Sequence, residues 1–263
     1  MGMGMGMERR KEQMKENTHH PTIAIVGTGN VATHLCKAFE ARATVYQVNP
    51  HTFEGMPESA DVVIISVKDT AIEEVSQNLP GTYGIVAHTS GSVPMSILSG
   101  CNSGYGVFYP LQTFTKGVEL DYSEIPFFIE GDSGKTVEAL THLARLISPN
   151  VREADSDSRK MLHLASVFAC NFSNCLVGIA DKLLKKKDMD YTVLLPLLKQ
   201  TMAKLNNLTP EEAQTGPAAR LDMPVVNRHV EMLQEMGESN LSEIYRDMSA
   251  EIIRMTHPKV KQR

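Results

Sequence analysis

The chain has 263 residues, of which 42% are hydrophobic and 22% are charged, enough to build one large globular domain or two ordinary ones. Its formal net charge of −5 at pH 7 argues against a nucleic-acid-binding protein, which would need a basic face. Four cysteines, at positions 36, 101, 170 and 175, have no metal-binding spacing. We therefore expect reduced thiols, no metal site and a cytoplasmic protein.

Residues 1–20 contain a Gly/Met repeat and then a charged run, without the apolar core of a signal peptide. We predict that this segment is a disordered extension. No stretch in the chain reaches the roughly 18–20 apolar residues of a membrane helix. We therefore expect no membrane association.

The first ordered segment combines an apolar run, Thr22–Val26, with the sequence Gly27-Thr28-Gly29-Asn30-Val31-Ala32 and a helical pattern. This order is typical of the strand, glycine turn and helix that bind a dinucleotide. Gly27 allows the tight turn, Gly29 lets a pyrophosphate approach the backbone, and free N–H groups at Asn30 and Val31 face the phosphates. We predict that Gly27, Thr28, Gly29, Asn30 and Val31 bind the cofactor. The alternative is a tight turn in a flavodoxin-like sheet that binds no nucleotide.

Strands and helices alternate through the first half of the chain. Apolar runs predict strands at 44–49, 61–67, 83–88, 104–109 and 126–130, and helical patterns lie at 69–79, 93–98 and 136–147. This alternation is typical of a parallel, doubly wound α/β sheet. We predict a Rossmann-like dinucleotide-binding domain at 21–150.

The pattern changes after Pro149, since residues 157–256 contain no convincing strand. The longest helix, predicted at 159–187, is apolar on nearly every side and is therefore expected to be buried. Further helices are predicted at 191–205, with a kink at Pro196, and at 224–236 and 241–255. We predict an all-helical domain at 151–263.

Taken in chain order, several motifs resemble one family. They are Gly27–Ala32, Ile65-Ser66-Val67-Lys68-Asp69, His88-Thr89-Ser90-Gly91-Ser92, Tyr109-Pro110-Leu111, His163 with Asn171, and Thr215–Arg220. The chain resembles Rossmann-like proteins with a C-terminal helical domain of unknown function (family 2520). These belong to the 6-phosphogluconate-dehydrogenase-like superfamily, with pyrroline-5-carboxylate reductase and the deazaflavin-dependent NADP oxidoreductases. The resemblance implies a nicotinamide dinucleotide, a cleft between the two domains and a homodimer formed through the helices.

The end of the second strand bears on the choice of cofactor. NAD sites usually place Asp or Glu there to hold the ribose 2′-OH, whereas this chain has Asn49. Because Asn49 would not repel a 2′-phosphate, NADP is favoured over NAD. The alternative is that this short loop holds no adenosine at all. Ser66 and Val67, at the carboxyl end of the third predicted strand, are predicted to contact the cofactor.

Two more strand ends carry polar side chains. His88, beside the hydroxyls of Thr89, Ser90 and Ser92, could orient a substrate carbonyl or carboxylate or move a proton. The alternative is a polar turn that caps the next helix. Tyr109 could be an acid or simply a wall of the cleft. Asp69 could serve the site or cap the helix that follows it.

The long helix carries a polar stripe, because His163, Ser166, Cys170 and Asn174 recur at steps of three and four. Asn171 lies at the edge of this stripe. The resemblance implies a catalytic lysine followed one turn later by an asparagine. Asn171 matches the asparagine, but Val167 stands at the lysine position, and His163 is the nearest replacement. The alternative is a core histidine held by hydrogen bonds.

Arg220 follows the turn at Thr215–Pro217 and could bind a substrate carboxylate, pair with Asp222 or form a dimer contact. We predict an NADP-dependent oxidoreductase that transfers hydride between nicotinamide and a small carbonyl or imine substrate in the interdomain cleft. His163, Asn171 and His88 are the catalytic candidates, and Ser90, Tyr109 and Arg220 are the substrate-binding ones. The alternatives are a dinucleotide-binding sensor or assembly protein without turnover, and a flavodoxin-like module without nucleotide.

Overall fold

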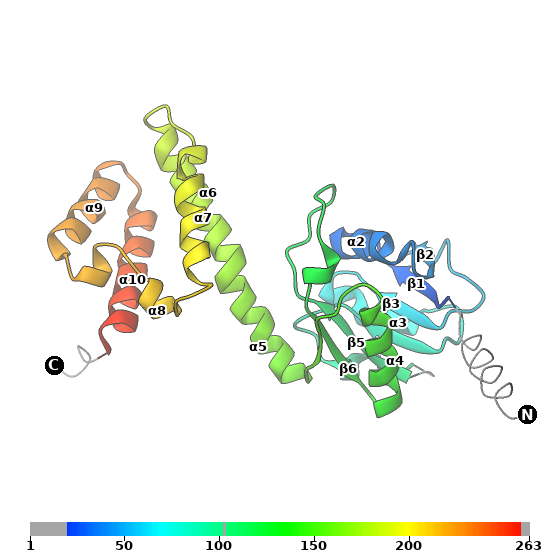
Figure 1. The fold of residues 1–263 in the computed structure, drawn as a ribbon. Helices are drawn as coiled ribbons and strands as arrows, with labels where there is room; N and C mark the ends of the chain where they lie inside the picture. Colours follow the sequence, from blue (N-terminus) through cyan, green and yellow to red (C-terminus); the bar gives the residue numbers. More distant parts are fainter. Residues whose placement is uncertain (1–19, 102–103, 259–263) are drawn as a thin grey trace, which may run out of the picture. The chain divides into compact units, whose positions relative to one another are not determined.

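The computed structural model describes residues 20–101 and 104–258 (Figure 1). The chain divides into two compact units, Met1–Asn174 and Cys175–Arg263. The first part of the long helix therefore groups with the sheet, and the boundary near residue 150 stays a prediction. The predicted N-terminal extension lies outside the described residues except for His20.

The first unit is built on a single seven-stranded sheet in the order β2-β1-β3-β4-β5-β6-β7. The strands are β1 (Thr22–Val26), β2 (Thr44–Val48), β3 (Val62–Ile65), β4 (Ile85–His88), β5 (Gly104–Pro110), β6 (Phe127–Gly131) and β7 (Val151–Glu153). The Rossmann-like α/β fold is as predicted. Two details are corrections, since β6 runs antiparallel to β5 and the three-residue β7 follows the predicted domain end.

Helices cover both faces of the sheet. On one face α2 (Asn30–Phe39) and α4 (Gly134–Arg145) pack Leu35, Phe39 and Leu140 against alternate strand residues. On the other face lie the short helices η1 (Asp69–Ala71), α3 (Ile72–Gln77) and η2 (Met95–Leu98), with Ile72 and Leu98 in the core. Each such side chain contributes about 1.5–3 kcal/mol by its burial. The connection from β5 to β6 includes η3 (Tyr122–Glu124).

The long helix consists of α5 (Ser156–Ser166), a π-helical segment η4 (Val167–Phe172) and α6 (Ser173–Lys185). Its start is capped by Asp155, whose carboxylate accepts a hydrogen bond of 2.7 Å from the Ser158 amide. The sequence predicts the helix but not its π-helical part. A π-helix is uncommon and is found most often at functional sites.

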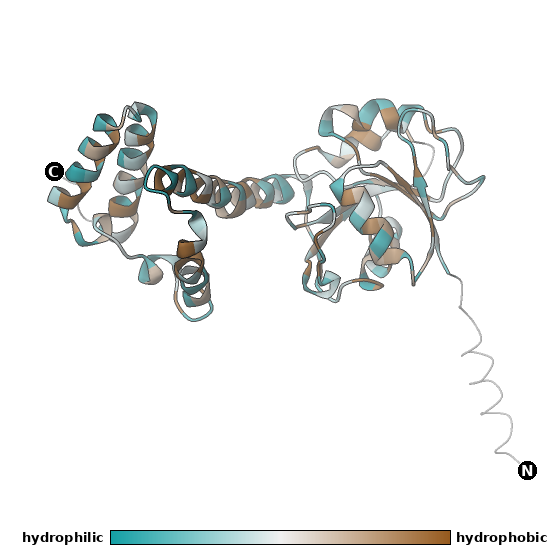
Figure 2. Cartoon of the chain, turned by 90° about the horizontal axis from the view of Figure 1, so that it is seen from above, coloured by the Kyte–Doolittle hydropathy of each residue, from teal (hydrophilic) through white to brown (hydrophobic). Residues whose placement is uncertain are grey.

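The expectation that this helix is buried is wrong for the described chain. Large apolar side chains stay exposed along it: Met161, Leu164, Phe168, Phe172 and Leu176. Figure 2 shows brown, hydrophobic colouring along part of the long helix. By length and composition alone, Ser156–Lys185 is also apolar enough to cross a membrane, contrary to the sequence expectation. A core helix of a soluble protein meets the same criterion.

The second unit is helical, with η5 (Tyr191–Leu194), α7 (Leu195–Lys204), α8 (Pro210–Ala213), η6 (Ala218–Arg220), α9 (Met223–Glu235) and α10 (Ser239–Thr256). Pro196 does not kink a helix, because it lies in the first turn of α7, where a missing N–H costs nothing. Thr209 and Glu212 form a capping box at α8. Val226, Val230 and Leu233 of α9 are buried, as are Ser242 and Ser249 of the neighbouring α10.

Candidate functional site

One large cavity, with a volume of about 1930 Å³, lies at the carboxyl edge of the sheet. Its walls are the segments that follow β1, β2, β3, β4 and β5, part of α3, and the stretch Leu162–Asn174 of the long helix. All of its lining residues belong to the unit Met1–Asn174. This edge is where doubly wound sheets bind ligands, so the cavity is the candidate site.

Glycine is required at positions 27 and 29 of the first turn for different structural reasons. Gly27 has φ +150°, and a Cβ atom on it would lie 2.1 Å from the Ser66 carbonyl oxygen. A Cβ atom on Gly29 would meet no atom within 4 Å, because Gly29 faces the open cavity. Gly27 thus shapes the turn, and Gly29 leaves space for a ligand.

The start of α2 fits a pyrophosphate. No side chain caps this end, and its first turn holds no acidic residue in the described structure. Thr28, Gly29, Asn30 and Val31 all line the cavity, where the free N–H groups and the positive end of the helix dipole favour an anion. The residues present therefore fit the phosphates of a dinucleotide.

The side chain of Asn49 forms hydrogen bonds to the backbone of the loop after β2. Its side-chain oxygen accepts hydrogen bonds from the backbone N–H groups of His51, at 2.9 Å, and Thr52, at 3.3 Å. Asn49 is not among the cavity-lining residues, whereas Pro50, His51 and Phe53 are. Asn49 therefore shapes the loop, and its neighbours supply the surface that a nucleotide would touch.

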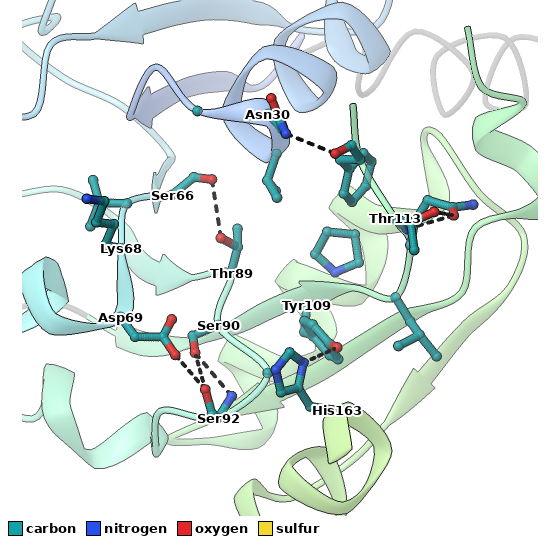
Figure 3. A pocket seen from close by; sticks show the side chains of 18 of the residues that line it. Asn30, Ser66, Lys68, Asp69, Thr89, Ser90, Ser92, Tyr109, Thr113 and His163 are labelled. Atoms are coloured by element: carbon teal, nitrogen blue, oxygen red, sulfur yellow. Dashed lines mark hydrogen bonds between the residues drawn. The ribbon is translucent and has the colours of Figure 1, made fainter. Parts of the chain in front are cut away.

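Ser66 and Val67 line the cavity as expected, and the Thr89 hydroxyl donates a hydrogen bond of 3.3 Å to the Ser66 hydroxyl. Asp69 does not cap a helix, since the N-cap position belongs to Lys68. Instead its carboxylate accepts a hydrogen bond of 2.5 Å from the Ser92 hydroxyl (Figure 3). Asp69 and Ser92 are both exposed to the cavity.

The side chains of Ser90 and His88 form hydrogen bonds to backbone groups of the loop after β4. The Ser90 hydroxyl accepts hydrogen bonds from the N–H groups of Ser92 and Val93, which closes the loop after β4. His88 is fully buried, and its Nδ1 accepts a hydrogen bond of 3.2 Å from the Ser90 N–H. His88 does not line the cavity, so it cannot touch a ligand there.

Burial is the main cause that lowers the pKa of His88 to about 4, and the positive charge of Arg159 lowers it further. The Pro94 carbonyl and Asp69 act in the opposite direction. No hydrogen bond of normal geometry reaches its Nε2 atom from the described residues. At neutral pH His88 is therefore an uncharged part of the core.

Tyr109 and His163 form the polar centre of the cavity. The Tyr109 hydroxyl and His163 Nδ1 are 3.2 Å apart, and the two rings meet edge to face (Figure 3). Burial raises the pKa of Tyr109, so its hydroxyl keeps its proton at neutral pH. The pair can hold a proton or pass it to a ligand.

The predicted polar stripe lies together on the cavity wall, since His163, Ser166, Cys170 and Asn174 all line it. Asn171 lines it as well and is exposed. Cys170 and Asn171 lie within the π-helical segment η4, and α6 follows it, so the wider winding of η4 sets which side chains face the cavity. Arg220 is exposed on η6 in the second unit, and its predicted role stays a prediction.

Sequence reasoning missed Gly91, which lies against the central pair. A Cβ atom on Gly91 would be 2.8 Å from both His163 Nδ1 and Tyr109 Cζ. It also missed the segment Thr113–Thr115, which lines the cavity. This segment is held to α2, because the Asn30 amide donates to the Phe114 carbonyl and His34 contacts Thr115 and Tyr122. Within the described residues, no three His, Cys, Asp or Glu side chains gather as metal ligands.

Comparisons with known proteins agree with this architecture. The model of the domain of unknown function DUF2520 matches residues 125–252. The "putative NADP oxidoreductase" of Bacteroides fragilis is 36% identical over 89% of this chain and 98% of its own, with a TM-score of 0.81. No curated protein matches the sequence.

More distant solved structures share the fold. A reductive aminase from Aspergillus terreus, in complex with NADPH and ethyl levulinate, is 14% identical over 91% of this chain and 95% of its own, with a TM-score of 0.62. An imine reductase from Myxococcus stipitatus, in complex with NADP⁺, is 15% identical over 91% and 96%, with a TM-score of 0.52. At this identity the likeness concerns the fold.

Proposed function

This chain belongs to the family of the Bacteroides fragilis protein, with the DUF2520 domain in its second half, and from that premise we propose that it is an NADP-dependent oxidoreductase. Its reaction is the transfer of hydride between nicotinamide and a small carbonyl or imine. The observation that carries the proposal is that one continuous cavity reaches from the Gly29 turn to the Tyr109–His163 pair. Its volume is ample for a dinucleotide and a small substrate.

Bound NADPH would supply the hydride, and the protein would supply orientation and a proton. The backbone N–H groups at Asn30 and Val31 would hold the pyrophosphate, with Ser66 and Val67 beneath the cofactor. The adenosine would lie along His51 and Phe53. NADP is favoured over NAD because the position directly after β2 is Asn49, where a carboxylate would repel a 2′-phosphate.

The Tyr109 hydroxyl is the proton donor in this proposal. Hydride addition to the carbon of a C=O or C=N bond leaves the oxygen or nitrogen in need of a proton, which the hydroxyl delivers. His163 Nδ1, at 3.2 Å, orients that hydroxyl and returns a proton to it. Asn171, which lies further along the same long helix and also lines the cavity, is available to hold the substrate heteroatom.

The reacting atoms would lie between the sheet edge and the stretch Leu162–Asn174. We propose that this space is the predicted interdomain cleft, which requires the domain boundary to lie near residue 150 rather than at residue 174. The exposed apolar side chains of the long helix support a homodimer formed through the helices, since a soluble monomer rarely leaves such a stripe uncovered. A cytoplasmic location is proposed from the sequence alone.

The second candidate is a dinucleotide-binding sensor or assembly protein without turnover. Val167 favours it, because this position carries a catalytic lysine in the related dehydrogenases that the chain resembles. Tyr109 and His163 favour the enzyme, since together they can supply the proton that the missing lysine does not.

Titration of the purified protein with NADPH and NADH, followed by cofactor fluorescence, tests the first step. A screen of small cyclic imines and ketones for oxidation of bound NADPH tests the second. We expect tighter binding of NADPH than NADH, and turnover with at least one imine or ketone. Tight binding without turnover would favour the sensor, and no binding of either nucleotide would overturn both candidates.

A further inference from the structure

Arg159 is a fully buried cation that the proposed chemistry does not use. It lies on α5, and its guanidinium donates hydrogen bonds to two backbone carbonyls of the loop after β4. Nε donates to the Ser90 oxygen at 3.1 Å, and Nη2 donates to the Val93 oxygen at 2.6 Å. One side chain of the helix thus holds both ends of this loop.

Glu130 and Ser156 hold the guanidinium in place. Nη1 of Arg159 forms an ion pair with Glu130 Oε2, and Nη2 donates to the Ser156 hydroxyl at 3.2 Å. The Glu130 carboxylate also accepts hydrogen bonds from the N–H and the hydroxyl of Ser156, at 2.9–3.0 Å. The Glu130 side chain is only 16% exposed, so the charges are paired where water is scarce.

Arg159 and His163 are four residues apart on α5, so they lie on the same face of the helix in successive turns. Gly91 lies in the loop that Arg159 holds, and its Cα faces His163 and Tyr109 so closely that a Cβ atom would collide with both. The hydrogen bonds of Arg159 therefore fix the spacing between helix and loop where the polar pair lies.

We propose that Arg159 is a positioning residue that holds the Ser90–Val93 loop against the Tyr109–His163 pair and so keeps the proton donor in its reactive place. This inference rests on the proposed reduction in the same cavity. The guanidinium fork suits the task because two donors in a rigid plane reach two carbonyls at once, which a lysine ammonium does only loosely.

Besides positioning the loop, Arg159 affects the pKa of Tyr109 through its positive charge. Burial raises the pKa of Tyr109, the Ser166 hydroxyl and the positive charge of Arg159 lower it, and the negative charge of Asp69 raises it. Arg159 is therefore one of two groups that limit the rise that burial causes. Substitution by lysine retains the charge and removes the fork, which separates the two contributions.

The test compares Arg159→Lys and Ser156→Ala with the matched control Lys160→Gln, an exposed neighbour on the same helix. Hydrogen–deuterium exchange of residues 88–95 reports on the loop, NADPH fluorescence reports on cofactor binding, and single-turnover reduction of the cyclic imine 1-pyrroline reports on chemistry. Ser156→Ala keeps the experiment decisive if Arg159→Lys does not fold, because it leaves Arg159 in place and removes only the hydroxyl that binds Glu130 and the guanidinium. The same hydroxyl accepts a hydrogen bond of 3.2 Å from the Met95 N–H, so the exchange of Met95 is left out of the comparison for this variant.

For Arg159→Lys we expect faster exchange in residues 88–95 and a loss of reduction rate of about 10- to 100-fold, with NADPH affinity within about twofold. Ser156→Ala should act in the same direction and more weakly, and Lys160→Gln should match the native protein. Unchanged exchange in both variants, a uniform rise of exchange over the whole chain, or a loss of NADPH affinity equal to the loss of rate would overturn the proposal.

If the native protein binds NADPH but reduces no imine or ketone, the proposed function fails on its own. The exchange of residues 88–95 then still decides whether Arg159 holds the loop. The two failures are therefore distinguishable.

Discussion

The Tyr109 hydroxyl and the Nδ1 atom of His163 lie 3.2 Å apart, although the two residues are 54 positions apart in the sequence. Tyr109 comes from the end of β5 and His163 from the second turn of α5. A hydroxyl whose neighbour can accept and return a proton is suited to general acid catalysis.

Tyr109→Phe should abolish most turnover while leaving cofactor binding intact, because it removes one hydroxyl and preserves the ring that packs on Phe128. We expect a loss of reduction rate of about 100-fold or more, which is typical for a general acid. Single-turnover oxidation of NADPH with an imine measures it.

Tyr46→Phe is the matched control, since Tyr46 is partly exposed on the edge strand β2. It should keep the native rate. A Tyr109→Phe variant with the native rate would show that the proton comes from another group.

Gly91→Ala should disturb the same pair by steric contact. The new methyl group would lie 2.8 Å from His163 Nδ1 and Tyr109 Cζ, which forces one of them to move. We expect a loss of about 1–3 kcal/mol in the free energy of unfolding and a larger fractional loss of turnover than of NADPH affinity. Gly134→Ala is the control, since a Cβ atom there meets nothing within 4 Å. Equal turnover in both variants would contradict this role of Gly91.

The sequence was sufficient to predict features that depend on local pattern. The turn at Gly27–Asn30 and the shared face of His163, Ser166, Cys170 and Asn174 follow from spacing alone. The antiparallel direction of β6 was not predictable, because an apolar run predicts a strand but not whether it runs parallel or antiparallel to its neighbour. The π-helical turns near Asn171 and the contact of Gly91 with His163 depend on tertiary packing, which no local pattern encodes.

The two glycines of the first turn should respond in opposite ways to alanine. Gly27→Ala forces a methyl group to within 2.1 Å of the Ser66 oxygen at φ +150°, so we expect loss of folding, measured by thermal unfolding. Gly29→Ala meets no protein atom, so it should fold normally. It should weaken NADPH binding by about tenfold or more, because the methyl group occupies the space proposed for the pyrophosphate. Native NADPH affinity in Gly29→Ala would argue against a pyrophosphate at this turn.

His88 should make the fold sensitive to acid. Its pKa is about 4 in the folded protein and about 6.5 when exposed, so the unfolded chain binds the proton first as the pH falls. Stability should therefore decrease between pH 6.5 and 4, by about 3 kcal/mol in total, and should not change from this cause above pH 7. His88→Asn keeps an acceptor for the Ser90 N–H and should flatten this part of the profile. Urea unfolding at several pH values measures it, and equal slopes in both proteins would exclude His88 as the cause.

The exposed apolar face of the long helix should be the surface through which two chains associate. Phe168 and Phe172 stack edge to face with ring centroids 5.0 Å apart, and they are 63% and 49% exposed. A stable dimer needs about 1,200–2,000 Å² of buried surface, and a charge in its apolar centre leaves the dimer with an unpaired buried ion. We expect the native protein to sediment as a dimer and Phe168→Glu to sediment as a monomer, while Val118→Glu, on an exposed loop, stays dimeric. A native protein that sediments as a monomer, or that requires detergent to remain in solution, would contradict association through this face.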